Sequence, residues 1–424
     1  MPFTLTETET SMLDGEAGEA VRICMALLCS YAKASNAEAF IPVTRCHIST
    51  AWYSGKSQLD FVERLHSEGA KVAVPTMLAA SITCLSRPEF DSDPDTSKRS
   101  TKLAELLVGM GCRPSFSCTP YYDGLRPTFG ECVSISESSA VPYLNSIYGA
   151  RTNQGYGFAD LAIAVCGRAP LAGLYIPENR KATLVVDLSE VPYDVMLHDA
   201  FYDILGQYIG RECDGSIPVI VGLPNSVVER HLRAVCASAA TAGSIRMFHV
   251  PGVTPEAPNM ETASQHAELP RKFVSLRDLK PHRDSLSTRD TYRRLNAVCL
   301  GAPQFSLEEF DLILAYLGNR SVHPDIRCSA SASRLTYDTL VQTGKLGALE
   351  AKGVIIIPDT CTYASLVDVG QRGLVMTNSA KWAYYGPMCF QCEVALGSLE
   401  ECVLSAIDGK VTRDDGFWSD DLWR

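Results

Sequence analysis

The stretch Gly353 to Asp359, GVIIIPD, is the clearest strand signal in this sequence and decides the fold class. Four apolar residues in a row, ended by proline and aspartate, are typical of a strand that is buried on both faces of a sheet. Stretches whose apolar residues recur at helical spacing separate this run from other apolar runs. The alternation predicts an α/β fold in which helices cover mostly parallel sheets. The similar runs lie at 182–188, 217–224, 244–250, 297–303, 326–331 and 374–380.

The N-terminal part of the chain follows the same rhythm less regularly. Thr6 and Glu9 have the spacing of a capping box, which predicts a helix that continues to Leu28. A segment rich in proline and charge, from Pro251 to Arg289, is the best candidate for a boundary. We therefore expect one or two N-terminal α/β lobes over 1–285 and a C-terminal α/β lobe over 286–424. The other expected elements are strands at 40–43 and 71–74, a polar turn with His47, a loop over 88–99, and helices over 102–110, 337–352 and 398–407.

Composition narrows the class of protein. The 424 residues include 38 Lys and Arg against 49 Asp and Glu, a net charge of −11 that disfavours a nucleic-acid-binding surface. No apolar stretch has the length of a membrane span, and the N-terminus lacks the pattern of a secretory signal. We expect a soluble cytoplasmic protein. In that reducing compartment most of the 16 cysteines should be buried thiols.

Several polar clusters follow apolar runs, where ligands gather in open α/β sheets. Cys118 and Cys361 lie in such turns, and they could converge across a cleft as cluster ligands do. Ser379 precedes Lys381 after another run, so the hydroxyl could be activated by the cation or could simply cap a helix. The segment 137–153 is dense in short hydrogen-bonding side chains and contains one arginine. It suits a small carboxylate, although turns and helix caps have the same composition.

The motifs CTPYYDGLRPTFGE (118–131), ESSAVPYLNSIYGARTN (137–153), FHVPGVTPEA (248–257) and MTNSAKWAYY (376–385) occur in this order. Together they resemble the catalytic, large component of the aconitase X family. The resemblance implies aconitase-like α/β/α lobes with a cleft between them. It implies a lyase of the dehydratase type that acts on a small hydroxylated acid, such as hydroxyproline or phosphomevalonate, with an iron–sulfur cluster. It also allows a small swivel subunit as a partner, and the chain could form a homo-oligomer. We expect no nucleic-acid partner and no membrane association.

The cluster ligands of the family are incomplete in this chain. Cys118 and Cys361 match two of the family's cysteine motifs, but its Gly-Cys-Pro-His motif is Gly301-Ala302-Pro303-Gln304 here. Cys299 cannot replace the missing ligand without remodelling, because an odd offset along a strand points a side chain to the other face. Two thiolates are too few for a cluster of the usual kind. We therefore expect the iron–sulfur site to be lost or degenerate, and the cofactor stays unknown.

The resemblance also assigns a substrate shell. Ser379 corresponds to the base, with Lys381 beside it, and Arg151 would hold a carboxylate. Without iron to polarise the leaving hydroxyl, a protein acid must assist, and Glu137 or Tyr121 are the candidates. Met77 and Ala79 replace polar residues of the family, which points to a larger or less polar substrate. The remaining shell residues by resemblance are Ser49, Ser138, Asn145, Ser146 and Asn153.

Three functions are compatible with these residues. The first is the family's dehydration of a small hydroxylated acid. The second is a repurposed, metal-independent enzyme of specialised metabolism that uses the same cleft for isomerisation, cyclisation or condensation, as Met77 and the missing cysteine suggest. The third is a non-catalytic binding paralogue. Retention of Arg151, Asn153 and Lys381 argues against the third, because a dead site has no need for all three.

Overall fold

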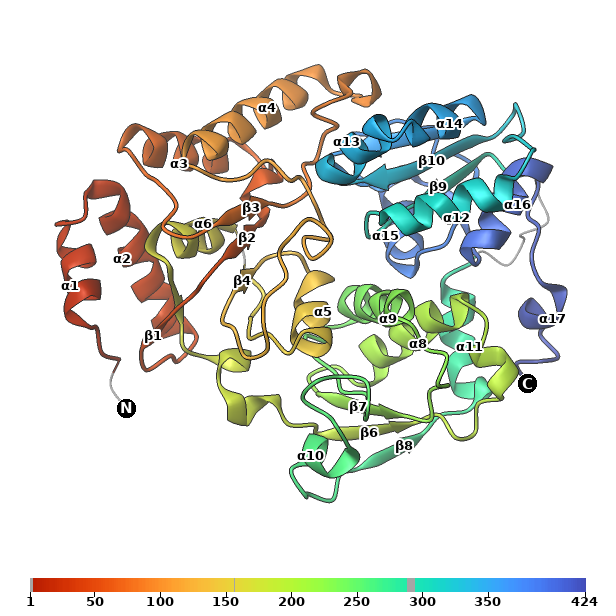
Figure 1. The fold of residues 1–424 in the computed structure, drawn as a ribbon, viewed down its shortest axis with the longest axis horizontal. Coiled ribbons are helices and arrows are strands. Elements are labelled where there is room, and N and C mark those ends of the chain that lie inside the picture. The colour runs from red at the N-terminus through yellow and green to blue at the C-terminus, as the bar shows by residue number, and fades with distance from the viewer. Residues whose placement is uncertain (1–2, 156, 288–293) are drawn as a thin grey trace.

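The computed structural model describes residues 3–155, 157–287 and 294–424. Three lobes follow one another along the chain and meet at the centre of the molecule (Figure 1). Among the named strands of these ranges, every pairing is parallel except that of β1 with β5. The predicted α/β class is therefore confirmed. No helix in the described ranges combines the length and the apolar character needed to cross a bilayer.

The N-terminal lobe is built on the parallel sheet β3-β2-β4 and the antiparallel pair β1-β5. Strand β2 is central, so its turn at Ser49 lies beside the turns that follow β3 and β4. Helices α2 and α6 pack against each other, as do α3 and α4. The elements are α1 (Glu7–Asp14), α2 (Glu19–Ala34), β1 (Phe40–Pro42), β2 (Cys46–Ile48), α3 (Lys56–Ser67), β3 (Thr76–Leu78), α4 (Pro94–Gly109), β4 (Ser134–Ile135), α5 (Ala140–Ile147), α6 (Gly157–Cys166) and β5 (Arg168–Pro170).

Four expectations for this lobe need correction. The polar turn predicted at His47 is wrong, because His47 lies in strand β2. The capping box at Thr6 is present, but Gly15 in the left-handed conformation ends the first helix and a second one follows. The strand predicted at 71–74 is also wrong: strand β3 begins only after Pro75. The loop predicted over 88–99 is partly helical. Asp93 caps α4 by accepting from two backbone N–H groups, and a proline follows at the first helical position, a start signal that composition concealed.

The central lobe contains the parallel sheet β7-β6-β8, with β8 lying inside the segment that we expected to be a connection. The strand predicted at 244–250 is wrong. The backbone of His249 bonds to residues 218 and 220 of β7, which makes an isolated bridge and no strand. The end of the expected connection, 288–289, lies outside the described residues. The elements are β6 (Leu184–Asp187), α7 (Tyr193–Met196), α8 (Ala200–Glu212), β7 (Pro218–Val221), α9 (Glu229–Ala242), α10 (Met260–Ser264), β8 (Arg271–Phe273) and α11 (Leu276–Ser285).

The C-terminal lobe has a five-stranded parallel sheet in the order β11-β10-β9-β12-β13. From β9 the chain moves outward to β10 and β11, then returns to β12 on the other side of β9. The single helix expected over 337–352 is two helices. The elements are β9 (Ala297–Leu300), α12 (Leu307–Leu317), β10 (Arg327–Ala332), α13 (Arg334–Gln342), α14 (Lys345–Ala351), β11 (Val354–Pro358), β12 (Leu374–Thr377), α15 (Ala380–Phe390), β13 (Glu393–Leu396), α16 (Leu399–Asp408) and α17 (Asp415–Trp418).

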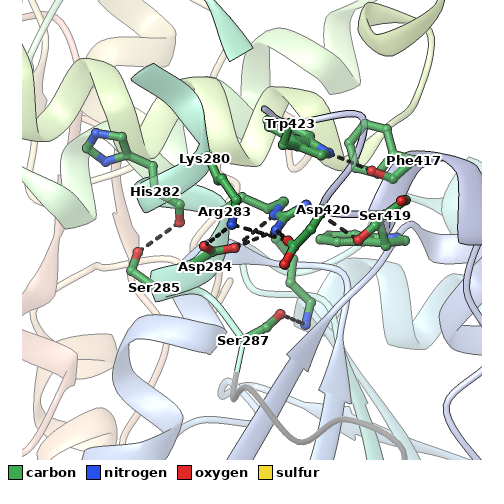
Figure 2. A network of polar contacts seen from close by, with 12 residues as sticks. Lys280, His282, Arg283, Asp284, Ser285, Ser287, Phe417, Ser419, Asp420 and Trp423 are labelled. Atoms are coloured by element: carbon green, nitrogen blue, oxygen red, sulfur yellow. Dashed lines mark hydrogen bonds and ion pairs between the residues drawn. The ribbon is translucent and has the colours of Figure 1, made fainter. Parts of the chain in front are cut away.

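The last residues of the chain tie the C-terminal lobe to α11 of the central lobe (Figure 2). Trp423 is fully buried, and its Nε1 donates to the carbonyl of Phe417 at 2.6 Å. The buried guanidinium of Arg283 lies 5.0 Å from the Trp423 ring centroid and forms ion pairs with Asp284 at 2.7 Å and Asp420 at 2.5 Å. This cluster therefore couples the position of α11 to that of the C-terminal lobe.

Helices α8 and α9 of the central lobe pack closely against each other. A Cβ added at Gly206 would lie 2.6 Å from Cβ of Ser238 and 2.8 Å from the carbonyl oxygen of Val235. Gly206→Ala is therefore expected to lower the free energy of unfolding by about 1–3 kcal/mol through overpacking. Gly347 in α14 is the matched control, because a Cβ there meets nothing within 4 Å. Gly347→Ala should stabilise by roughly 0.5–1 kcal/mol. Urea denaturation of both variants tests the contrast, and equal effects would contradict it.

Candidate active site

Turns from the N-terminal and C-terminal lobes meet where the parallel strands end. The turns after β9, β11 and β12 supply Gln304, Cys361 and Lys381, and the N-terminal lobe supplies Cys118 and Glu137 opposite them. The carboxyl ends of parallel strands lie at one edge of a sheet, which is why residues so far apart in sequence come together. This meeting point contains the two predicted cluster cysteines and two of the predicted catalytic residues.

Glu137 and Lys381 form an ion pair between the two lobes. Lys381 Nζ lies 2.6 Å from Glu137 Oε1, and the side chains are only 4% and 15% exposed. Burial opposes the charged form of each group, but the opposite charge of the partner outweighs it. The pKa of Glu137 is therefore lowered and the pKa of Lys381 is raised. Glu137 is an ionised carboxylate and Lys381 a protonated ammonium, with Ser138 Oγ 3.5 Å from the ammonium.

The two cysteines that were expected to converge do so. Cys118 Sγ and Cys361 Sγ lie 3.9 Å apart, buried in a small cluster with Ala80 and Tyr363. The backbone N–H of Gln304 donates to Cys118 Sγ at 3.1 Å. Burial and the neighbouring Cys361 raise the pKa of the Cys118 thiol well above its usual value, although the charge of Lys381 acts in the opposite sense. At neutral pH Cys118 is therefore a thiol.

Gln304 joins the two cysteine turns. Its Oε1 accepts from the backbone N–H of Cys118 at 2.8 Å. Its Nε2 donates to the carbonyls of Phe116 at 3.2 Å, Ala332 at 3.0 Å and Thr360 at 3.1 Å. The side chain is fully buried and both its polar atoms are satisfied. The amide thus connects three separate turns where the family pattern places a histidine.

The residues at this place do not fit an iron–sulfur cluster. Cys118 and Cys361 are two sulfur donors, and the third position is the buried methyl group of Ala302. Cys299 belongs to strand β9 and contacts Ser329 of β10 instead. In the described ranges no group of three or more His, Cys, Asp or Glu side chains could hold a metal ion. A cluster needs three or four protein ligands, and this place supplies only two.

Two further buried groups lie in the same region with polar atoms unused. His47 Nε2 lies 2.7 Å from the carbonyl of Ser117, so Nε2 carries the proton and Nδ1 is an acceptor. Burial lowers the pKa of His47, although the nearby charge of Glu137 acts in the opposite sense, so the ring is neutral. Neither His47 Nδ1 nor the Tyr121 hydroxyl has a hydrogen-bond partner in the described part of the chain. No motif surrounds His47 in the sequence, so only the structure shows that it lies near Glu137.

Ser379 is the N-cap of α15, so the capping alternative left open by the sequence describes its geometry. Its Oγ accepts from the backbone N–H of Trp382 at 3.2 Å and donates to the carbonyl of Ala302. The next residue, Ala380, donates its N–H to Asp203 Oδ1 at 2.7 Å. Burial raises the pKa of Asp203 to about 7. Sequence reasoning missed Asp203, which lies in a helix without any motif around it.

Most of the remaining predicted shell is engaged by the protein itself. Ser49 donates to Asp160 through N–H and hydroxyl, and Asn145 bonds to Thr152, Arg180 and Arg246. Asn153 holds the turn at 172–174, and Ser146 accepts from residue 248. These bonds give the four residues structural roles, which is the alternative that composition left open for the three that lie within 137–153. Arg151 is half-buried and forms no ion pair with any residue that the structure describes, and Met77 is buried beside His47.

Models of all three aconitase X domains match the chain in order. The aconitase X first domain matches residues 2–178, the second domain 182–282 and the third domain 295–408. The chain belongs to the aconitase X family. The aconitase X second and third domains thus correspond to the central and C-terminal lobes, and the Glu137–Lys381 ion pair joins the first domain to the third.

Three named relatives and one solved structure support the same family. A cis-3-hydroxy-L-proline dehydratase of Pseudomonas aeruginosa is 36% identical over 95% of this chain and 70% of its own length. The enzyme of that name from Hypocrea jecorina is 34% identical over 99% of this chain and 71% of its own. The phosphomevalonate dehydratase large subunit of Methanocaldococcus jannaschii is 32% identical over 94% of this chain and 98% of its own. The crystal structure of Thermococcus kodakaraensis aconitase X (holo-form) matches with a TM-score of 0.82 at 29% identity, covering 95% of this chain and 100% of that one.

These findings confirm the expected family, the aconitase-like fold with mostly parallel sheets, and an enzyme of the aconitase X dehydratase type. The named relatives are dehydratases, and none of their names favours the alternative of isomerisation, cyclisation or condensation. The assignments of individual site residues stay predictions.

Proposed function

We propose that this aconitase X protein removes water from a small hydroxylated carboxylic acid without an iron–sulfur cluster, with Lys381 as the proton donor. The observation that carries the proposal is the buried ion pair of Lys381 with Glu137. An elimination needs a base for the substrate's C–H proton and an acid for the leaving hydroxide. An ammonium held in its charged form by a fixed carboxylate is such an acid.

The electrostatics change the role of Glu137. Sequence reasoning offered it as the acid, but an ionised carboxylate has no proton to give. In this proposal Glu137 instead keeps Lys381 protonated and oriented. When Ser379 has taken the C–H proton and Lys381 has given its proton to the departing hydroxide, the products are the unsaturated acid and water. Return of the proton from the Ser379 hydroxyl to the neutral amine of Lys381 restores both groups. Tyr121, whose pKa is raised by burial, stays a neutral hydroxyl and is the second candidate for an acid.

Ser379 takes the role of base by resemblance, and two features of its surroundings support that role. It lies at the N-terminus of α15, where the helix dipole favours negative charge. The Trp382 N–H that points at Oγ would stabilise an alkoxide. Lys381 follows two residues later in the same first turn, so base and acid are positioned by one helix end. Substrate contacts by Arg151 and Ser138 are part of the same proposal.

Assays with candidate hydroxy acids test the function directly. The chain should release water from a non-phosphorylated acid of the hydroxyproline class, seen as a product lighter by one water in mass spectrometry. Activity should be equal after aerobic and anaerobic purification and after chelation of iron, because the donor set does not fit a cluster. Loss of activity on chelation, with return on reconstitution by iron and sulfide, would contradict the cluster-free mechanism. Turnover without any loss of water would contradict the dehydratase.

We also propose a partner and a location for this chain. The large-subunit name of one relative supports a small swivel subunit as a partner of this chain, which co-expression with a matching small subunit would test. All sixteen cysteines are free thiols, which supports a location in a reducing compartment such as the cytoplasm.

A further inference from the structure

Asp203, a buried residue of α8, reaches from the central lobe to the start of α15 in the C-terminal lobe. Its Oδ1 accepts a hydrogen bond from the backbone N–H of Ala380 at 2.7 Å, and the residue is 6% exposed. Ala380 stands between Ser379, the proposed base, and Lys381, the proposed proton donor. A bond from another lobe therefore holds the residue that joins these two groups in the chain.

Two side-chain oxygens share the N-terminal end of α15. Ser379 Oγ accepts from the N–H of Trp382 at 3.2 Å, and Asp203 Oδ1 takes the N–H of Ala380. The first N–H groups of a helix have no partner within the helix, and the helix dipole adds positive potential there. This potential favours one negative charge, either an alkoxide on Ser379 or a carboxylate on Asp203. Because like charges disfavour each other, an ionised Asp203 opposes the alkoxide.

The charged groups around Asp203 are already paired with one another, and Asp203 forms no ion pair with any residue that the structure describes. Burial therefore dominates and raises the pKa of Asp203 to about 7. The bond from Ala380 and the charge of Arg233 act in the opposite sense, whereas Asp199 adds to the rise. Below this pH the carboxyl group is neutral, and above it the group is charged. The surrounding groups are Asp199 of α8 with Arg230 and His231 of α9, Arg233 of α9 with Glu309 of α12, Lys381 of α15 with Glu137, and the thiol of Cys402 in α16.

A cavity between the central and C-terminal lobes gives protons a route to this carboxyl group. The cavity has a volume of about 70 Å³, and both Asp203 and Ser379 line it. A space of this size holds water, which can carry a proton to or from the carboxyl group while the lobes stay in place. The charge of Asp203 therefore follows the pH of the solution.

We propose that Asp203 is a positioning residue of the active site, which fixes the start of α15 through Ala380 and opposes the basic form of Ser379 whenever its carboxyl group is charged. The inference deepens the proposed function and rests on it in one respect, because it takes Ser379 to be the base. Lys381 keeps its proton well above neutral pH, since the charge of Glu137 outweighs burial and raises the pKa of Lys381. A fall in turnover above about pH 7 is therefore the signature of Asp203.

The pH dependence of kcat tests the effect on the base. In the parent, kcat should fall as Asp203 ionises above about pH 7. Asp203→Asn keeps an acceptor for Ala380 without the charge, so its kcat should not fall there. Asp203→Leu loses the acceptor too, so its kcat should be at least tenfold lower than that of Asp203→Asn at every pH. Asp93→Asn, at the N-cap of α4, is the matched control and should follow the parent. A parent without the fall, a fall that persists in Asp203→Asn, or equal kcat of the Asn and Leu variants would overturn the proposal.

A charge placed at Ser379 tests the same competition without turnover. Ser379→Asp sets a carboxylate where the alkoxide would form, and Ser379→Asn has the same size without the charge. Above neutral pH the urea midpoint of Ser379→Asp should lie below that of Ser379→Asn, and the gap should be larger with Asp203 present than in the Asp203→Asn background. Equal gaps would refute the inference. If Ser379→Asp does not fold, the pH profile of Asp203→Asn decides.

The two measurements separate this inference from the proposed function. A chain that shows the coupling of positions 203 and 379 but dehydrates no acid refutes only the proposed function. A chain that dehydrates an acid without the coupling refutes only the role of Asp203.

Discussion

Lys381→Met is expected to lower the free energy of unfolding by about 3–5 kcal/mol and to abolish turnover. The substitution leaves the carboxylate of Glu137 buried without its counter-charge, and breaking a buried ion pair by removing one partner costs about this much. The same substitution removes the proposed proton donor. Chemical denaturation followed by circular dichroism measures the first effect, and a dehydration assay measures the second.

The double variant Lys381→Met, Glu137→Gln separates the two effects. Removing both charges relieves the unpaired carboxylate, so most of the lost stability should return while turnover stays absent. An active double variant would contradict the role of Lys381 as the acid. The exposed ion pair of Lys56 with Asp60 is the matched control, because its side chains are 83% and 51% exposed. Lys56→Met should change stability little.

Ser379→Ala is expected to lower turnover at least 100-fold, the smallest contribution expected of a positioned base. It also removes an N-cap, which costs about 1 kcal/mol of stability. A fall in turnover at saturating substrate, measured well below the unfolding temperature, is therefore the relevant readout.

Thr6→Ala provides the comparison for the capping effect. Thr6 caps α1 in the N-terminal lobe, and its Oγ1 accepts from the N–H of Glu9 at 3.3 Å. This variant should lose a similar amount of stability, about 1 kcal/mol, with turnover unchanged. If Ser379→Ala and Thr6→Ala behave alike, Ser379 is a helix cap and not the base.

The sequence predicted the C-terminal sheet best because burial of a strand on both faces produces long apolar runs. GVIIIPD and AVCLGAP both contain strands, β11 and β9. The run 244–250 has a similar composition but makes only an isolated bridge to β7, at the edge of the sheet opposite β8. A run of apolar residues therefore indicates burial and does not by itself indicate a strand.

The candidate site was predictable where a motif marked it. Glu137, Cys361 and Lys381 follow strands β4, β11 and β12, and the topology of parallel sheets brings such turns together. Asp203 lies inside a helix and carries no local signal, so only the packing of α8 against the start of α15 reveals it. The structural roles of Asn145 and Asn153 could not be predicted either. An asparagine that binds a ligand and an asparagine that holds a turn look the same in a sequence.

Gln304 also determines how the two cysteine turns are held before any ligand arrives. Its side-chain amide connects the turn of Cys118, the end of β10 and the turn of Cys361 through four hydrogen bonds. These bonds are made entirely within the protein. The spacing of Cys118 and Cys361 is therefore preorganised by the fold, so a molecule that binds beside the pair meets a site that is already assembled.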